Sequence, residues 1–334
     1  MLYPNLDFEY ELAAFKLAGA EDFLEWGRAQ EPTKHLKAIT ERWKDILHLL
    51  PPREFTAWGM SPSAFARQHD TGLALPSFSP HLVSKINDKR FSHALELELG
   101  LELEGARIVS SIEDLRGAVV DCSYSWVAKH PFGVSGRERI KGDPRSLYEE
   151  QVRWAARQFE ASWELVFEPW IDVDRELSLQ FEIAPGENTR FLGALELVTD
   201  SQGTHRGHRS LDLTEDLAPL IKGATSAVRR IGSLGYVGPV GVDAFIGHLD
   251  GELILRPITE INARYTFGRL ALELSRFIPE DRRFYWWHPS RRRAEELEEP
   301  IRGAIDEGVE AAGYYRLPDF ADPGGRSGTL VHIE

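Results

Sequence analysis

Hydrophobic and polar positions along the chain predict a mixture of helices and strands. Apolar residues recur at helical spacing in 35–50, 84–99, 146–162, 215–233 and 268–278. Shorter apolar or alternating runs predict strands in 53–60, 106–111, 125–142 (a strand–loop–strand unit), 163–171, 175–184, 189–200, 238–264 (a hairpin) and 328–334. The strands outnumber the crossover helices and are joined mainly by hairpins. We therefore expect an α+β protein with mainly antiparallel sheets, rather than a doubly wound parallel sheet.

Turn and breaker residues divide these elements. Asp250-Gly251 stands between two apolar runs, which is a strong hairpin signal. Gly100 follows the helical pattern of 84–99 and is a candidate cap for its end. Pro257 interrupts the second arm of the hairpin and indicates a bulge. Residues 201–210 are expected to form a loop that interrupts the sheet.

The bulk composition narrows the class of protein. The 334 residues suit two or three compact units, and 39 basic against 53 acidic residues give a net charge of −14. Such a chain repels phosphate overall, so neither nucleic acid nor an anionic membrane is expected as a partner. The single cysteine, Cys122, fits a reducing compartment, where we expect it to be buried in a strand. We find no 18-residue apolar run and no signal-peptide pattern at the start, and we expect a cytoplasmic protein.

The stretch "TEINARYTFG" (259–268) holds the first candidate chemistry. On a strand, Glu260, Asn262 and Arg264 point to the same side, because alternate residues share a face. Asp243 lies on the other arm of the predicted hairpin, so these oxygens meet at one end of a sheet. Carboxylate and amide oxygens are the ligands that Mg²⁺ accepts. An ordinary solvated sheet face is the alternative interpretation.

Two further stretches suggest a nucleotide site. In "KHPFGVSGR" (129–137), Lys129 precedes a turn with Gly133, Ser135 and Gly136, and glycines let backbone N–H groups approach an anion. This is not a Walker A loop, and a plain flexible hairpin is the alternative. "VFEPWI" (166–171) could offer a nucleobase polar edges and apolar walls, or could be an edge strand with a proline.

The order of these pieces resembles the ATP-grasp superfamily over residues 84–275, most closely in "VAKHPFGVSG" and "VGVDAFI…TEINAR". The resemblance implies the ATP-grasp fold, in which two α+β subdomains with mainly antiparallel sheets grip ATP, here after a small mixed α/β N-terminal domain. The implied domains are 1–83 and 84–334, with a lid subdomain at about 123–170, a metal-binding subdomain at about 171–300 and a tail at 301–334.

Residue roles follow from the same resemblance. The implied ATP contacts are Lys89, Lys129, Gly133, Ser135, Gly136, Glu168, Trp170, Ile171 and Glu176. The implied Mg²⁺ ligands, with Mn²⁺ as an alternative metal, are Asp243, Glu260 and Asn262. Lys129 and Arg264 would act in catalysis, and Gly268 would begin a helix whose N-terminus favours negative charge. One departure is Gly241, where D-alanine–D-alanine ligase-like enzymes carry an arginine, which argues against D-alanine ligation.

Most members of this superfamily join a carboxylate to an amine through an acyl phosphate, releasing ADP and phosphate. We therefore expect a carboxylate–amine ligase acting on an amino acid or small peptide. A phosphotransferase on the same scaffold and an ATP-binding protein without turnover are the alternatives. "GTHRGHR" is a candidate substrate loop, with His205, Arg206, His208 and Arg209 able to hold a substrate carboxylate, or it is a solvated loop. A homodimer is left open.

Overall fold

The computed structural model describes most of the chain between residues 57 and 287. The described residues are 57–71, 74–133, 138–186, 188–199, 205–211, 217–276, 278, 282–287, 314–316 and 330–333. The chain divides into two compact units, Met1–Pro80 with His288–Val331, and His81–Trp287 with His332–Glu334. Every described candidate site residue belongs to the second unit.

The first unit has few described elements. They include α4 (Pro62–Thr71) and the short strand β11 (Tyr314–Arg316), while β12 (Leu330–Ile333) lies at the boundary with the second unit. The helix predicted at 35–50 lies outside the described residues. Of the strand predicted at 53–60, residues 57–60 are described and form bends without strand pairing, so that part of the prediction is wrong. The N-terminal domain boundary at residue 83 stays a prediction.

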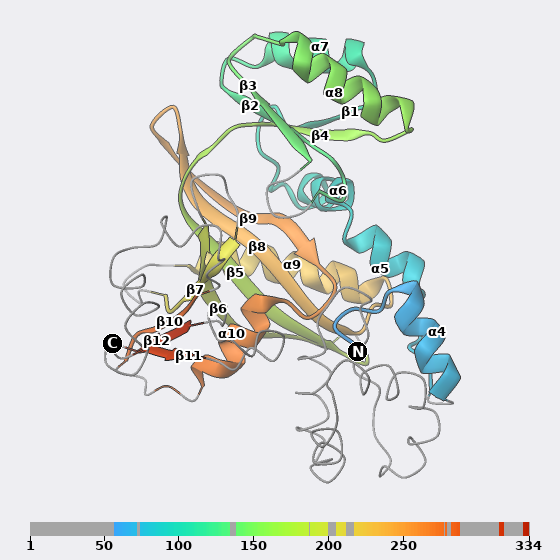
Figure 1. The fold of residues 1–334 in the computed structure, drawn as a ribbon, viewed down its shortest axis with the longest axis vertical. Helices are drawn as coiled ribbons and strands as arrows, with labels where there is room; N and C mark the ends of the chain where they lie inside the picture. Colours follow the sequence, from blue (N-terminus) through green and yellow to red (C-terminus); the bar gives the residue numbers. More distant parts are fainter. Residues whose placement is uncertain are drawn as a thin grey trace, which may run out of the picture. The chain divides into compact units, whose positions relative to one another are not determined.

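A four-stranded antiparallel sheet forms one part of the second unit, in the order β1-β4-β2-β3 (Figure 1). Its strands are β1 (Arg107–Val109), β2 (Trp126–Lys129), β3 (Arg139–Gly142) and β4 (Leu165–Pro169). Two helices, α7 (Ile112–Asp121) and α8 (Glu149–Glu160), pack together on one face of this sheet. The core under them holds buried Trp126, Ala128 and Phe167. The alternate positions Val127 and Lys129 therefore belong to the opposite face of the sheet.

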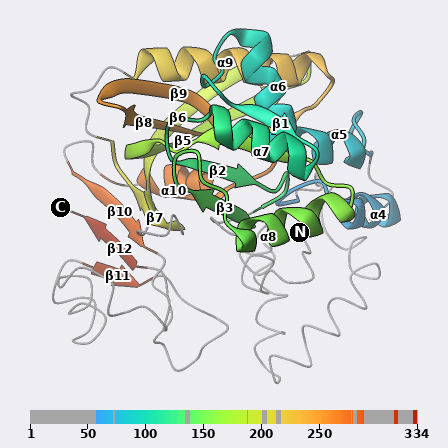
Figure 2. The same ribbon diagram turned by 90° about the horizontal axis from the view of Figure 1, so that it is seen from above.

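The larger sheet is also antiparallel. Within the second unit its strand order is β10-β7-β6-β5-β8-β9. Its strands are β5 (Asp172–Ala184), β6 (Asn188–Thr199), β7 (His205–Arg209), β8 (Gly238–Leu249), β9 (Glu252–Asn262) and β10 (Phe284–Trp287). Helix α9 (Ala218–Ser233) runs along this sheet in Figure 2 and packs against β5, β6, β8 and β9, while α10 (Phe267–Ser275) packs against β5 and β6. Two mostly antiparallel sheets with packed helices confirm the predicted α+β class.

The predicted hairpin is present and fixes the register of its two arms. Asp250 and Gly251 have φ values of 53° and 82°, and the backbone conformation at both central residues is the one that a tight hairpin turn requires. β8 and β9 pair from Leu249↔Glu252 to Gly241↔Asn262. The register shifts between Asp243 and Phe245, opposite a segment of β9 that contains Pro257, so the predicted bulge is confirmed.

The prediction of a single helix at 84–99 is wrong in one respect, because two helices occupy this region. α5 (Pro80–Ile86) ends before Asn87, and α6 (Lys89–Leu99) begins after Asp88. Asp88 is the N-cap, and its carboxylate accepts a hydrogen bond from the Arg90 N–H at 2.8 Å. Gly100 ends α6 with φ 66°, as predicted. The break places Lys89 at the first turn of a helix.

Two smaller predictions also differ from the structure. Residues 205–209 form β7 inside the larger sheet and not a loop, because they pair with both β6 and β10. Cys122 is buried as expected, but it follows the end of α7 and is not in a strand. Within the described residues, no helix combines the length and the apolar character needed to cross a membrane.

Candidate active site

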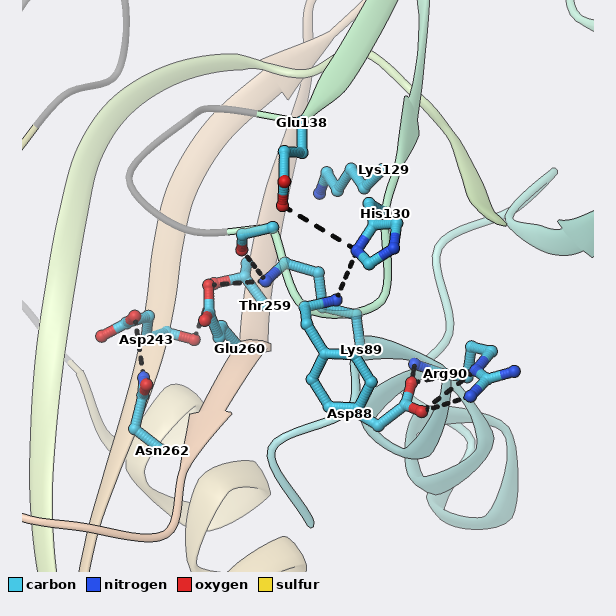
Figure 3. A network of polar contacts seen from close by, with 12 residues as sticks. Asp88, Lys89, Arg90, Lys129, His130, Glu138, Asp243, Thr259, Glu260 and Asn262 are labelled. Atoms are coloured by element: carbon cyan, nitrogen blue, oxygen red, sulfur yellow. Dashed lines mark hydrogen bonds and ion pairs between the residues drawn. The ribbon is translucent and has the colours of Figure 1, made fainter. Parts of the chain in front are cut away.

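Two carboxylates face each other where β8 and β9 approach the end of the larger sheet. Asp243 is the register partner of Glu260, and Asn262 lies two residues further along β9. The Asn262 amide donates a hydrogen bond to Asp243 Oδ2 at 3.3 Å, and the Thr259 hydroxyl donates to the Asp243 carbonyl at 2.9 Å (Figure 3). The hairpin thus brings together the three oxygen-bearing side chains predicted for the metal.

The charge on this pair explains why it suits a cation. Burial and the neighbouring charges of Glu260 and Glu176 raise the pKa of Asp243 to about 7. Among the described residues, no group of three or more His, Cys, Asp and Glu side chains is arranged to hold a metal ion. Mg²⁺ in nucleotide sites typically uses one or two carboxylates and completes its octahedron with phosphates and water. Asp243 and Glu260 fit that pattern, whereas the Asn262 oxygen accepts a hydrogen bond from Arg264 in this structure and would have to turn toward the metal to join them.

Lys89 reaches the same place from the start of α6. Its ammonium lies 3.2 Å from Glu260 Oε2 and donates to the Gly133 carbonyl at 2.6 Å (Figure 3). The Lys89 N–H also donates to the Pro131 carbonyl at 3.0 Å. One lysine therefore connects the glycine turn after β2 with the carboxylate pair on the larger sheet.

The turn after β2 is organised by His130. Its ring Nδ1 accepts from the Phe132 N–H at 3.1 Å, and its carbonyl accepts from the Gly133 N–H at 3.1 Å. Burial lowers the pKa of His130, which favours the neutral ring that this acceptor role needs. Ser135 and Gly136, the remaining predicted residues of the turn, lie outside the described residues. Of the three residues predicted for this turn, Gly133 is the one that the structure describes.

Arg264 lies two residues beyond the end of β9, the strand that carries Glu260 and Asn262. Its guanidinium donates to Asn262 Oδ1 at 2.6 Å and to the Tyr265 carbonyl at 3.2 Å. Neither acceptor is a carboxylate, and a guanidinium has five N–H donors. The group therefore keeps donors for an anion beside the carboxylate pair. Its hydrogen bond also fixes the Asn262 amide, with the nitrogen toward Asp243 and the oxygen toward Arg264.

Lys129 and Glu168 pair on the face of the four-stranded sheet opposite to α7 and α8. Lys129 lies at the end of β2, Glu168 is on the adjacent β4, and their side chains form an ion pair. Glu168 is almost fully buried, and Arg256 from β9 donates to its other oxygen. Burial alone would raise the pKa of Glu168, but Arg256 and Lys129 hold it well below its usual range.

Arg256 and its second partner, Glu96, were not among the predicted site residues. Arg256 makes a two-pronged ion pair with Glu96 of α6, with Nε–Oε1 at 2.8 Å and Nη2–Oε2 at 2.9 Å. Both side chains are buried, at 4% and 1% exposure. No local pattern in the sequence indicated this contact, because Glu96 and Arg256 lie 160 residues apart.

The segment predicted to hold a nucleobase continues from β4 into β5. The Trp170 N–H donates to the Ser125 carbonyl at 2.7 Å, so this N–H is committed to the protein. The Lys141 ammonium lies 3.1 Å from the centre of the Trp170 ring. Burial lowers the pKa of Lys141 to about 8. Ile171 is buried and Glu176 lies on β5, where burial raises its pKa.

The four residues predicted to bind a substrate carboxylate all belong to β7. His208 is buried and stacks on Trp286, while His205 stacks on Phe267 and lies 3.3 Å from His208, between ring nitrogens. Arg209 forms an ion pair with Glu196, which Arg175 also contacts at 3.2 Å. These contacts tie His205, His208 and Arg209 to other parts of the protein, on β6, β10 and α10.

Comparisons with known proteins find likeness in structure and not in sequence. No model of a known protein family matches the chain, and no curated protein matches it significantly.

Three solved structures illustrate the likeness. A biotin carboxylase from Campylobacter jejuni, in a β,γ-ATP complex, has a TM-score of 0.58 at 11% identity, over 81% of this chain and 68% of that one. An N5-carboxyaminoimidazole ribonucleotide synthetase from Thermus thermophilus has 0.53 at 17% identity, over 81% and 74%. The biotin carboxylase domain dimer of Hydrogenobacter thermophilus 2-oxoglutarate carboxylase, with MgADP, ADP and bicarbonate, has 0.56 at 13% identity, over 81% and 67%.

These structures are ATP-grasp enzymes, and the likeness identifies the fold. The chain has an ATP-grasp fold, as its sequence predicts.

Proposed function

We propose that this protein is an ATP-dependent ligase that joins a carboxylate to an amine through an acyl phosphate and releases ADP and phosphate. The observation that carries the proposal is the meeting of Asp243 and Glu260 on paired strands, with Lys89 at 3.2 Å from Glu260 and Arg264 attached to the neighbouring Asn262. Paired carboxylates with cations around them suit a metal–polyphosphate complex better than a solvated sheet face.

The structural neighbours support ATP as the co-substrate. Of the two biotin carboxylase structures, one is a complex with an ATP form and the other is a complex with MgADP, ADP and bicarbonate. On this basis we propose that the turn at Gly133, Ser135 and Gly136, together with Lys89 and Lys129, holds the phosphates. The base would lie against the segment from Glu168 through Trp170 to Ile171, with the ribose at Glu176.

In the reaction, a carboxylate oxygen of the acyl donor attacks the γ-phosphorus, and the bond to the β–γ bridging oxygen breaks, releasing ADP. The amine nitrogen then attacks the acyl carbon, phosphate leaves, and the amine loses a proton. Mg²⁺ held by Asp243, Glu260 and Asn262 would neutralise phosphate charge, with Mn²⁺ as a substitute. The protein supplies mainly positioning and charge complementarity, since this chemistry needs no protein nucleophile.

Two of the predicted residues take defined tasks in this scheme. Arg264 keeps N–H donors beside the carboxylate pair, so it would face the transferred phosphoryl group or the acyl phosphate. Arg206 remains a candidate on β7 for the substrate carboxylate, together with His205, His208 and Arg209. The acyl donors to test first are amino acids and dipeptides, followed by bicarbonate.

We also propose where the enzyme acts and how it assembles. The single cysteine supports a cytoplasmic location. A homodimer is a second proposal, because one neighbouring structure is described as a domain dimer.

The test incubates the purified protein with Mg²⁺, ATP, pooled amino acids and dipeptides, and hydroxylamine, and reads all products by mass spectrometry. We expect ADP together with a hydroxamate, whose mass identifies the acyl donor. Both products should disappear with Glu260→Gln. The matched control is Glu252→Gln at the exposed far end of the same strand, which should retain both products.

Other results would change the assignment. ADP with a phosphorylated product and no hydroxamate would identify a phosphotransferase. Turnover that persists in Glu260→Gln would show that the carboxylate pair is not the active site.

A further inference from the structure

Four charged side chains form an unbroken chain of ion pairs through the interior of the second unit. Glu96 on α6 pairs with Arg256 on β9, Arg256 pairs with Glu168 on β4, and Glu168 pairs with Lys129 on β2. These residues come from four elements that are far apart in the sequence. The chain therefore joins the larger sheet, through β9, to the four-stranded sheet, through β4 and β2.

The burial of this chain is uneven. The side chains of Glu96, Arg256 and Glu168 are 1%, 4% and 4% exposed, whereas that of Lys129 is 21% exposed. The charges balance, with two carboxylates and two cations. Lys129 is thus the one member of the four with appreciable access to a ligand, and the other three lie behind it.

The oxygens of Glu168 are divided between the two cations. Arg256 Nη2 donates to Oε1, and Lys129 Nζ donates to Oε2. Arg256 is itself anchored by the two-pronged contact with Glu96, and its planar fork permits few orientations. The position of the Glu168 carboxylate, and hence of the Lys129 ammonium, follows from the position of Arg256.

The buried histidine on the same helix as Glu96 adds no competing charge to this chain of ion pairs. His93 lies one turn before Glu96 on α6, is buried, and has a ring Nδ1 without a hydrogen-bond partner. Burial lowers its pKa, which keeps the ring neutral. Of the two cations in the chain of ion pairs, Arg256 is the one that contacts both buried carboxylates.

We propose that Arg256 is a positioning residue for phosphate binding: it holds Glu168, and Glu168 in turn orients Lys129 toward the phosphates of ATP. The inference rests on the proposed ATP-dependent function. In this proposal the Glu168 carboxylate orients Lys129 and does not contact the base. The base is recognised by the segment that follows Glu168, at Trp170 and Ile171. Because β9 also carries Glu260 and Asn262, one strand sets both the metal ligands and the phosphate lysine.

The test compares binding of MgATP and of adenosine by competition with a fluorescent ATP analogue. Arg256→Lys keeps the charge and loses the fork, so we expect MgATP affinity to fall about tenfold. Adenosine affinity should stay within about twofold, because the proposal gives Lys129 a contact with the phosphates and none with the nucleoside. In a Lys129→Met background, Arg256→Lys should change MgATP affinity by less than about twofold, because its effect is routed through Lys129.

The matched control is Arg269→Lys, which weakens the ion pairs to Glu182 and Glu273 on β5 and α10 and should leave MgATP affinity unchanged. Glu96→Gln provides a second route if Arg256→Lys does not fold, with the same selective loss for MgATP. Equal losses for MgATP and adenosine, or a full loss in the Lys129→Met background, would overturn the inference while the proposed function stands. A wild-type protein that binds no MgATP would overturn both.

Discussion

Asp243 and Glu260 are direct register partners on β8 and β9, and two carboxylates in that relationship repel each other. Burial and this repulsion raise the pKa of Asp243 to about 7. Lys89 offsets part of the charge from 3.2 Å away, at Glu260. A cation bound between the two side chains would remove the conflict, so the arrangement favours ligand binding at the expense of the stability of the empty protein.

Asp243→Asn should therefore stabilise the protein in the absence of metal while abolishing turnover. The amide keeps the shape of the side chain and removes the repulsion with Glu260, so we expect a gain of about 1–2 kcal/mol in the free energy of unfolding. Urea unfolding in the presence of a chelator measures the gain, and ADP release measures turnover. A variant that is both less stable and active would contradict this account of the pair.

Lys89→Met should weaken nucleotide binding without unfolding the protein. The methionine keeps most of the apolar stem but loses the ammonium that contacts Glu260 and the Gly133 carbonyl. We expect the KM for ATP to rise about tenfold, as for the loss of one charged hydrogen bond. Lys85→Met, at an exposed position in α5, is the matched control and should leave the KM unchanged.

Gly268→Ala should destabilise the protein through a steric clash. A Cβ at this position would lie 2.3 Å from Ser178 Oγ and 2.8 Å from Gln180 Nε2, both on β5. We expect a loss of about 1–3 kcal/mol in the free energy of unfolding, because α10 would have to move away from the sheet.

The control for that change is Gly117→Ala in the interior of α7, where a Cβ meets no atom within 4 Å. Alanine favours a helix over glycine, so this variant should gain about 0.5–1 kcal/mol. Equal effects of the two substitutions in urea unfolding would show that the close approach at Gly268 is not tight.

His205 should make the protein sensitive to acid. Burial lowers its pKa from the ordinary 6.5 to about 4. Between these values the unfolded chain binds a proton that the folded protein does not, so the stability contribution is present above pH 6.5 and is lost as the pH falls toward 4. One such group contributes a slope of about 1.4 kcal/mol per pH unit. His205→Gln should flatten the unfolding free energy measured by urea between pH 6.5 and 5, and parallel profiles would contradict the assignment.

Local signals in the sequence were enough to predict the hairpin that forms the centre of the site. Asp250-Gly251 specified a tight turn, which places Phe245 opposite Arg256. The bulge that Pro257 indicated then brings Asp243 opposite Glu260 instead of Ile258. Gly100 likewise specified the end of α6. In each case the residues that determine the structure lie next to each other in the chain, so their pattern can be interpreted without knowledge of the fold.

Contacts across long sequence separations could not be predicted in the same way. The break before α6 depends partly on Asn87, whose side-chain oxygen accepts from the Ala263 N–H at 2.8 Å. The polar residues of 205–209 indicated a loop. In the structure they form β7, and Gly207 and His208 are buried where this strand lies between β6 and β10. A Cβ on Gly207 would lie 2.2 Å from the Trp286 carbonyl oxygen, so that glycine serves strand packing and not a turn.

The buried ion pairs of Arg256 are also contacts across long sequence separations. Its partners lie 88 and 160 residues earlier in the chain, and a single arginine beside a proline carries no indication of either. Such a residue is recognised only when the fold brings Glu96 and Glu168 to it.

The bulge in β9 has a consequence for how this chain tolerates insertions and deletions. Three residues, Pro257 to Thr259, separate Arg256 from Glu260 and stand opposite the single residue Ala244 on β8. Because side chains on a strand alternate between faces, losing or gaining one residue here would turn Glu260 and Asn262 to the wrong face while Arg256 kept its place. The number of residues between Arg256 and Glu260 thus constrains this protein as strictly as the identity of either.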